Sequence, residues 1–222
     1  MSKKPTERTS KKIYKQIVEL IEREKIFFLF TGDSIKPLIE ASEYLWKNGF
    51  NLIGIDFRIP GVKDLLKSIK RKGQRNLGVF SISTRKEARI AINAGALFIF
   101  STHADKGIIR RCNKESLFHA IGALTPTEIS NAYDLGANLV SIYPCEQMGG
   151  LSWFMFLREI FPKVKFVPTD KMSPYEASQY LNAGAYAVAP IIDLERIKDP
   201  KELIREFSVT LGRDDPSGRL YK

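Results

Sequence analysis

The sequence predicts an α/β protein, a single (β/α)8 TIM barrel with an N-terminal amphipathic helix. Two observations support this fold class. Eight short apolar stretches alternate with eight helical patterns, and a glycine precedes every second apolar stretch. These glycines are separated by 46, 41 and 48 residues and are Gly49, Gly95, Gly136 and Gly184. A βαβα unit repeated four times is the pattern of a closed parallel barrel.

The alternative fold is an open doubly wound sheet. That fold predicts a glycine-rich phosphate-binding turn after its first strand, and Thr31-Gly32-Asp33-Ser34 lacks the required glycine spacing. The barrel is therefore the favoured interpretation.

The first element is an amphipathic helix over Ser10–Lys25, in which Ile13, Ile17 and Ile21 recur at helical spacing. The expected strands are Ile26–Thr31, Asn51–Phe57, Asn76–Ile82, Leu97–Ser101, Phe118–Leu124, Asn138–Tyr143, Lys165–Pro168 and Tyr186–Pro190. A helix follows each strand, and the last covers Pro200–Leu211. We expect a basic disordered arm over residues 1–9, the barrel over 10–213 and a flexible tail over 214–222.

Helix boundaries carry local signals. Thr125-Pro126-Thr127-Glu128 and Ser173-Pro174-Tyr175-Glu176 each combine a hydroxyl cap, a proline at the first helical position and a glutamate at the third. Thr84 and Glu87 repeat the cap and the glutamate. The four glycines that precede strands are suited to end the helices before them in a left-handed conformation.

Composition excludes several classes of protein. The 222 residues are 44% apolar, enough for a sizeable core, yet the longest apolar runs are far shorter than the roughly 20 residues of a membrane helix. The N-terminus has no apolar signal segment, so we expect the cytoplasm, or an organelle stroma or matrix if the sequence is a mature form. Two isolated cysteines, Cys112 and Cys145, fit a reducing compartment and offer no metal site.

The net charge of +10 is partly local, with lysines and arginines clustered in the arm and over 67–75. Such clusters suit nucleic acid, phosphate ligands or an acidic partner. Because no nucleic-acid motif accompanies them, we favour a solvated basic face over a nucleic-acid site.

Chemistry in such a barrel belongs to the loops after the strands. Arg58 can capture a carboxylate or phosphate in bidentate fashion, or pair with Asp56 or Asp33 at the rim. His103 can act as an acid or base or be structural, and Glu146 can be a base or a helix cap. Lys171 follows Asp170, and an exposed ion pair is the favoured interpretation. No Walker loop, serine elbow, cysteine cluster or H-E-x-x-H motif is present.

The order of motifs from about Glu19 to Ile192 resembles the 2-keto-3-deoxy-6-phosphogluconate (KDPG) aldolases and 4-hydroxy-2-oxoglutarate aldolases. The segments that carry the resemblance are Ile55–Pro60, Ala94–Ile99, Leu124–Glu128, Tyr143–Gly150 and Val164–Thr169. The resemblance implies a small trimeric class I aldolase barrel that needs no cofactor or metal and acts on 2-oxo acids.

The resemblance also implies that two catalytic groups are missing. The family's Schiff-base lysine falls at Ser141, whose hydroxyl cannot form an imine, and its acid/base glutamate falls at Gly54. The family's Pro-Thr-Gly-Gly phosphate turn falls at Pro168-Thr169-Asp170-Lys171, where Asp170 adds repulsion and Lys171 partly offsets it. The substrate-binding positions expected to remain are Arg58, Ser81, Tyr143, Thr169 and Lys171.

Two functions follow from this pattern. In the first, the chain is a pseudoenzyme that serves as a binding or assembly subunit, as a homotrimer or within a larger assembly. In the second, it is an active lyase or isomerase on a small 2-oxo acid, with Arg58 and a relocated carboxylate, Asp56 or Glu146.

Overall fold

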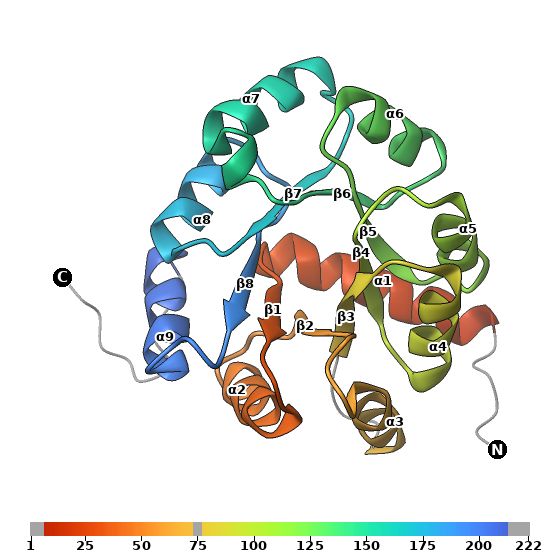
Figure 1. Cartoon of the computed structure of the whole chain (residues 1–222), viewed down its shortest axis with the longest axis vertical. Coiled ribbons are helices and arrows are strands. Elements are labelled where there is room, and N and C mark those ends of the chain that lie inside the picture. Colours follow the sequence, from red (N-terminus) through yellow and green to blue (C-terminus); the bar gives the residue numbers. More distant parts are fainter. Residues whose placement is uncertain (1–6, 73–76, 213–222) are drawn as a thin grey trace.

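Eight parallel strands close into a barrel, and each strand pairs with its neighbours in sequence order (Figure 1). The structure is a computed structural model that describes residues 7–72 and 77–212. Its strands are β1 (Phe28–Thr31), β2 (Ile53–Asp56), β3 (Leu77–Ile82), β4 (Phe98–Ser101), β5 (Phe118–Gly122), β6 (Leu139–Ile142), β7 (Phe166–Asp170) and β8 (Ala189–Asp193). The predicted fold class is confirmed.

The last strand lies three residues later than predicted. In the expected segment Tyr186–Pro190, Val188 forms only an isolated bridge with Ile26, and the ladder with β1 begins where Leu29 pairs with Ile191. The apolar character of Tyr186–Val188 comes from its burial at the start of the strand, not from regular pairing.

Helices cover the outside of the barrel between successive strands (Figure 1). They are α2 (Ile35–Lys47), α3 (Val62–Lys72), α4 (Arg85–Ala94), α5 (Lys106–Lys114), α6 (Pro126–Asp134), α7 (Gly150–Ile160), α8 (Pro174–Asn182) and α9 (Pro200–Thr210), with a short 3-10 helix η1 (Glu146–Met148) before α7. The capping boxes predicted at Thr84, Thr125 and Ser173 all form. The four glycines have the left-handed backbone that ends a helix, with φ between 80° and 111°.

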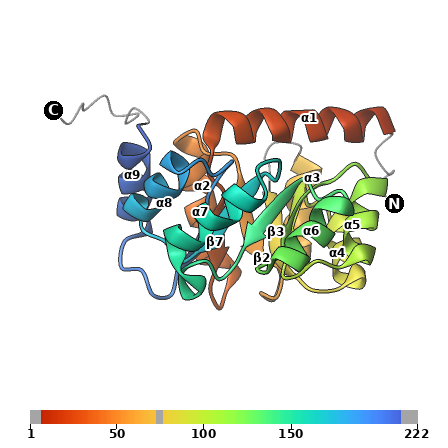
Figure 2. The same ribbon diagram turned by 90° about the horizontal axis from the view of Figure 1, so that it is seen from above.

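Helix α1 (Glu7–Glu24) lies across the N-terminal end of the barrel (Figure 2). It begins three residues before the predicted Ser10, so residues 7–9 are helical and do not belong to the expected arm. The reason is local: residues 7–9 contain no proline or glycine that would stop the helix. Residues 1–6, residues 73–76 of the basic 67–75 cluster and the predicted tail lie outside the described residues.

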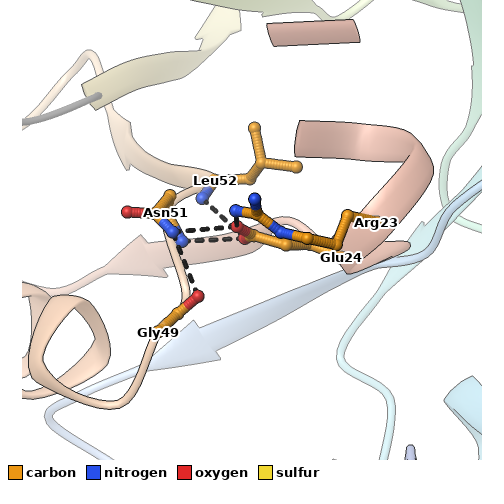
Figure 3. Close-up of polar contacts among 5 residues, drawn as sticks. All are labelled: Arg23, Glu24, Gly49, Asn51 and Leu52. Atoms are coloured by element: carbon orange, nitrogen blue, oxygen red, sulfur yellow. Dashed lines mark hydrogen bonds and ion pairs between the residues drawn. The ribbon is translucent and has the colours of Figure 1, made fainter. Parts of the chain in front are cut away.

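A buried carboxylate attaches the end of α1 to the barrel. Glu24 is 2% exposed and accepts hydrogen bonds from the backbone N–H of Asn51 at 2.7 Å and of Leu52 at 3.3 Å (Figure 3). It also accepts from the Asn51 side-chain amide at 2.9 Å and from Arg23 at 3.0 Å. The carboxylate therefore satisfies backbone donors at the entrance to β2, which fixes α1 against the barrel.

The core has two parts. One lies between the sheet and its helices, and the other fills the barrel interior and extends to Ile17 and Ile21 of α1. In the described part of the chain, no helix has the length and apolar character needed to cross a membrane.

Candidate functional site at the C-terminal end of the barrel

Three polar side chains are almost fully buried near the C-terminal ends of β2, β6 and β7. Asp56, Ser141 and Thr169 are 1%, 3% and 4% exposed. Strand alternation explains their position, because each follows interior residues of its own strand at a spacing of two. Buried polar groups need partners, and each of the three has one.

Asp56 is paired with Arg58. The backbone N–H and Nε of Arg58 donate to Oδ1 of Asp56 at 3.0 Å each, and Nη2 donates to Oδ2 at 2.6 Å. The Thr31 hydroxyl adds a longer contact to Oδ2 at 3.4 Å. The hydrogen bond to Asp56 raises the pKa of Arg58, whose side chain is 73% exposed. The predicted pairing of Arg58 with Asp56 is therefore present in the structure.

A short chain of hydrogen bonds runs from the Ser141 hydroxyl to the Thr169 hydroxyl and on to a backbone carbonyl. Their oxygens are 2.8 Å apart, and the Thr169 hydroxyl donates to the carbonyl of Val167 at 3.1 Å. A hydroxyl has one hydrogen, so the Ser141 hydroxyl must donate to Thr169. Ser141 is thus a satisfied buried hydroxyl in contact with the neighbouring strand.

Glu146, after β6, and Asp170, at the end of β7, have structural contacts. The Tyr180 hydroxyl of α8 donates to Oε1 of Glu146 at 3.0 Å, and burial raises the pKa of Tyr180. Asp170, 5% exposed, accepts from the backbone N–H of Glu146 at 2.9 Å and of Lys171 at 2.8 Å. Glu146 begins η1, and the N-cap residue of α7 is Gly149. Glu146 is therefore not the cap of α7, which was its alternative predicted role.

The other predicted site residues do not belong to the two buried pairs. Ser81 lies at an irregularity of β3 with φ of 62°, and Tyr143 is 47% exposed. The side chain of Lys171 is exposed, as is His103, whose Nδ1 lies 3.0 Å from the Thr102 hydroxyl. Within the described residues, no hydrogen bond joins these four side chains to the Asp56–Arg58 pair or to the Ser141–Thr169 pair.

An aromatic side chain fills the barrel beneath Asp56. Gly54 of β2 pairs with Gly78 of β3, and the ring of Phe98 lies over both glycines. A Cβ at Gly78 would be 2.2 Å from this ring, and a Cβ at Gly54 would be 2.6 Å from Leu29 and 3.4 Å from the ring. Phe98 also packs edge-to-face on Phe27 at 5.1 Å. The sequence reasoning missed this arrangement, although the paired glycines were its signal.

The eight strands contain no lysine over their described ranges. Two lysines that closely precede strands, Lys25 before β1 and Lys165 before β7, lie at the opposite end of the barrel. Their ammonium nitrogens are 4.8 Å and 4.3 Å from the centroid of the Tyr186 ring. Among the described residues, no group of three or more histidine, cysteine, aspartate and glutamate side chains could hold a metal ion.

Known proteins are similar to this chain over most of its length. The profile of a family described as KDPG and KHG aldolase matches residues 17–198. A 2-dehydro-3-deoxy-phosphogluconate aldolase of Treponema pallidum is 24% identical over 166 residues, which cover 74% of this chain and 79% of that protein. The corresponding protein of Zymomonas mobilis is 28% identical over 148 residues, or 66% of this chain and 69% of that protein.

Solved structures agree with the fold. A 4-hydroxy-2-oxoglutarate/2-dehydro-3-deoxyphosphogluconate aldolase superposes with a TM-score of 0.75 at 23% identity, covering 87% of this chain and 98% of that one. A porous protein cage, designed by fusing symmetric oligomeric domains, superposes with a TM-score of 0.72 at 16% identity, covering 84% of this chain and 72% of that one.

Proposed function

Because this chain belongs to the KDPG and KHG aldolase family, we propose that it is a member without Schiff-base aldolase activity, a pseudoenzyme that serves as a binding or assembly subunit. In this proposal Ser141 and Gly54 take the positions of the family's lysine and glutamate. The route through an imine is then lost altogether, because a hydroxyl cannot condense with a 2-oxo acid to form one.

The observation that carries the proposal is the filled interior around Gly54. A glutamate at this position would have to displace Leu29, because even a Cβ would come within 2.6 Å of its Cδ2. Leu29 and Phe98 are both 0% exposed, so neither has open space beside it. The barrel interior around Gly54 is therefore suited to apolar packing and leaves no space for a catalytic carboxylate.

The loop after β7 supports the same proposal. Asp170 places a buried carboxylate against the backbone N–H groups of Glu146 and Lys171. A phosphate seeks such N–H groups, and here an internal anion already accepts their hydrogen bonds. A phosphorylated sugar acid would therefore meet negative charge where it needs donors.

An exposed apolar face supports the assembly role. Met155, Phe156 and Ile160 of α7 are 55%, 47% and 44% exposed, and Met148 of η1 is 40% exposed. The opposite side of α7 is buried through Phe154 and Leu157, so this helix is apolar on both sides. Such a helix suits contact with another subunit, and we propose a homotrimer built on this face. Sedimentation of the wild type and of Met155→Glu/Phe156→Glu tests it, since a monomeric wild type contradicts a homo-oligomer.

The proposed absence of Schiff-base activity is tested by treating the protein with pyruvate and borohydride. A Schiff-base enzyme gains the mass of one reduced pyruvate on a lysine, and the Zymomonas mobilis aldolase is the positive control. We expect this chain to gain no such mass, and to release no pyruvate from KDPG or from 4-hydroxy-2-oxoglutarate. A trapped adduct together with pyruvate release would overturn the proposal, and peptide mapping would then identify the lysine, with Lys171 the first to examine.

A second candidate is an active lyase or isomerase on a small 2-oxo acid or a similar anion. It is favoured by the buried Asp56 carboxylate beside the exposed Arg58 at the functional end of the barrel. Glu146 is the other candidate acid or base, and Ser81, Tyr143, Thr169 and Lys171 would complete the binding positions. If Asp56→Asn and Arg58→Ala leave both ligand binding and turnover unchanged, this candidate is wrong.

The proposal involves no cofactor or metal. The two buried cysteines are free, which suits a reducing compartment such as the cytoplasm or an organelle interior.

A further inference from the structure

Two adjoining cavities lie between α1 and the N-terminal ends of β5, β6 and β7, at the end of the barrel opposite the candidate site. Their volumes are about 260 and 280 Å3, and both are lined by Tyr14 of α1 and by Asn138 before β6. Because they share these two residues, the cavities are adjacent, and we call the pair the α1 groove. None of its lining residues belongs to the candidate site at the C-terminal end of the barrel.

The α1 groove is basic. Lys11 lines one cavity, and Lys163 and Lys165 line the other. The cavities are also lined by the uncharged polar side chains of Asn113, Ser116 and Asn138. Among the described residues, no aspartate or glutamate lines either cavity. The lysines come from α1 and from the segment before β7, so the fold brings together charges that are far apart in the sequence.

Two tyrosines lie near the lysines of the groove. The Lys165 ammonium lies 4.3 Å from the centroid of the Tyr186 ring, which limits its freedom. The Tyr186 hydroxyl in turn donates to Glu22 at 3.3 Å. Burial raises the pKa of Tyr14, so its hydroxyl stays neutral and remains a donor. The groove thus offers lysine ammonium groups and uncharged donors, with no acidic side chain among its described lining residues.

We propose that the α1 groove binds a small oligophosphate. A lysine ammonium is a compact point charge and a common phosphate ligand, whereas planar carboxylates favour arginine. Lys163 and Lys165 line the same cavity and suit linked phosphate charges, and the amide and hydroxyl groups of the two cavities supply additional hydrogen bonds. This site is separate from the proposed pseudoenzyme role, and its failure would leave that role unaffected.

Titration calorimetry with sodium tripolyphosphate tests the proposal. Lys163→Gln/Lys165→Gln removes two charges from the groove, and Lys86→Gln/Lys106→Gln removes two exposed charges from the opposite end of the barrel. We expect saturable 1:1 binding to the wild type, an affinity at least tenfold weaker in the groove variant, and less than a threefold loss in the control. Tyr14→Phe, which removes only a hydroxyl, should weaken binding by a smaller factor.

Three outcomes would overturn the proposal. One is the absence of saturable binding to the wild type. A second is an equal loss in the two double variants, which would indicate general charge attraction without a site. The third is displacement of tripolyphosphate by a single-stranded oligonucleotide that binds more tightly and with steep salt dependence, because the occupant would then be nucleic acid. Circular dichroism of each variant confirms that the loss of binding is not a loss of fold.

Discussion

The packing of Phe98 against paired glycines leads to a ranked prediction for the barrel interior. A Cβ at Gly78 would lie 2.2, 2.3 and 2.5 Å from three atoms of the Phe98 ring, whereas a Cβ at Gly54 would lie 2.6 Å from one methyl of Leu29. A rigid ring cannot move away as easily as a methyl group. Gly78→Ala should therefore destabilise the barrel more than Gly54→Ala, although both add one carbon.

The magnitudes follow from overpacking. Adding a methyl group to a well-packed core costs about 1–3 kcal/mol of unfolding free energy, so Gly54→Ala should lie in this range and Gly78→Ala at or above its upper end. Gly54→Glu adds a buried carboxylate without a cation, a further penalty of several kcal/mol. Since a domain of this kind has about 5–15 kcal/mol in total, Gly54→Glu should be largely unfolded or strongly destabilised.

Urea denaturation followed by circular dichroism measures these changes. Gly32→Ala is the matched control, because its Cβ would meet only ordinary contacts of 3.6 Å and longer with Glu195. It should change the unfolding free energy by less than about 0.5 kcal/mol. Replacing Phe98 with leucine should reduce the cost of Gly78→Ala, a coupling that a double-mutant cycle detects. If Gly78→Ala and Gly54→Glu are as stable as Gly32→Ala, the interior is not filled as described.

Three further predictions concern other parts of the molecule. Glu24→Gln should lower the free energy of unfolding by about 1.5–3 kcal/mol, because the buried carboxylate accepts hydrogen bonds from two backbone N–H groups. The exposed Glu19→Gln is the control and should change it little. Equal unfolding free energies in the two variants would contradict this prediction. Backbone hydrogen bonds from Thr125 and Leu124 hold the pKa of Glu128 below its usual 4.5, so its contribution to stability is present above that pH and disappears as the pH falls through the lowered value. The difference in melting temperature between wild type and Glu128→Gln should thus shrink in acid, and a constant difference would refute it. Burial raises the pKa of Cys112 to about 12 and of Cys145 to about 11, so Ellman's reagent should label neither thiol rapidly until the protein is unfolded; rapid labelling of the native protein would show that a thiol is accessible.

The fold was predictable because its signals are local. Capping boxes at Thr84, Thr125 and Ser173 depend on residues three apart, and the left-handed glycines act within one turn. The errors also have local causes. The sequence pattern begins the last strand too early because buried apolar residues precede its regular pairing, and it begins α1 too late because Glu7 and Arg8, both good helix formers, precede Ser10.

The site was less predictable because its contacts cross strands. The sequence is compatible with two roles for Arg58, because a guanidinium forms the same charge-assisted hydrogen bonds with a neighbouring aspartate and with a bound anion. The position of Phe98 over Gly54 and Gly78 depends on the relative registers of β2, β3 and β4, which no local pattern specifies. Tyr180 likewise reaches Glu146 from a helix 34 residues away in the sequence.

The two ends of the barrel differ in how much hydrogen-bonding capacity they leave for a ligand. At the C-terminal end, Nε and Nη2 of Arg58 already donate to Asp56, which is 1% exposed, so an anion there meets only the remaining guanidinium donors unless it draws the group away from Asp56. Drawing it away would weaken the hydrogen bonds of a buried acceptor, at a cost of about 1–3 kcal/mol. At the N-terminal end, Lys163 is exposed and Lys165 rests on an aromatic ring, so neither side chain must leave a buried carboxylate to meet a phosphate. Anion binding is therefore favoured at the N-terminal end of the barrel, whereas the family resemblance places the chemistry at the C-terminal end.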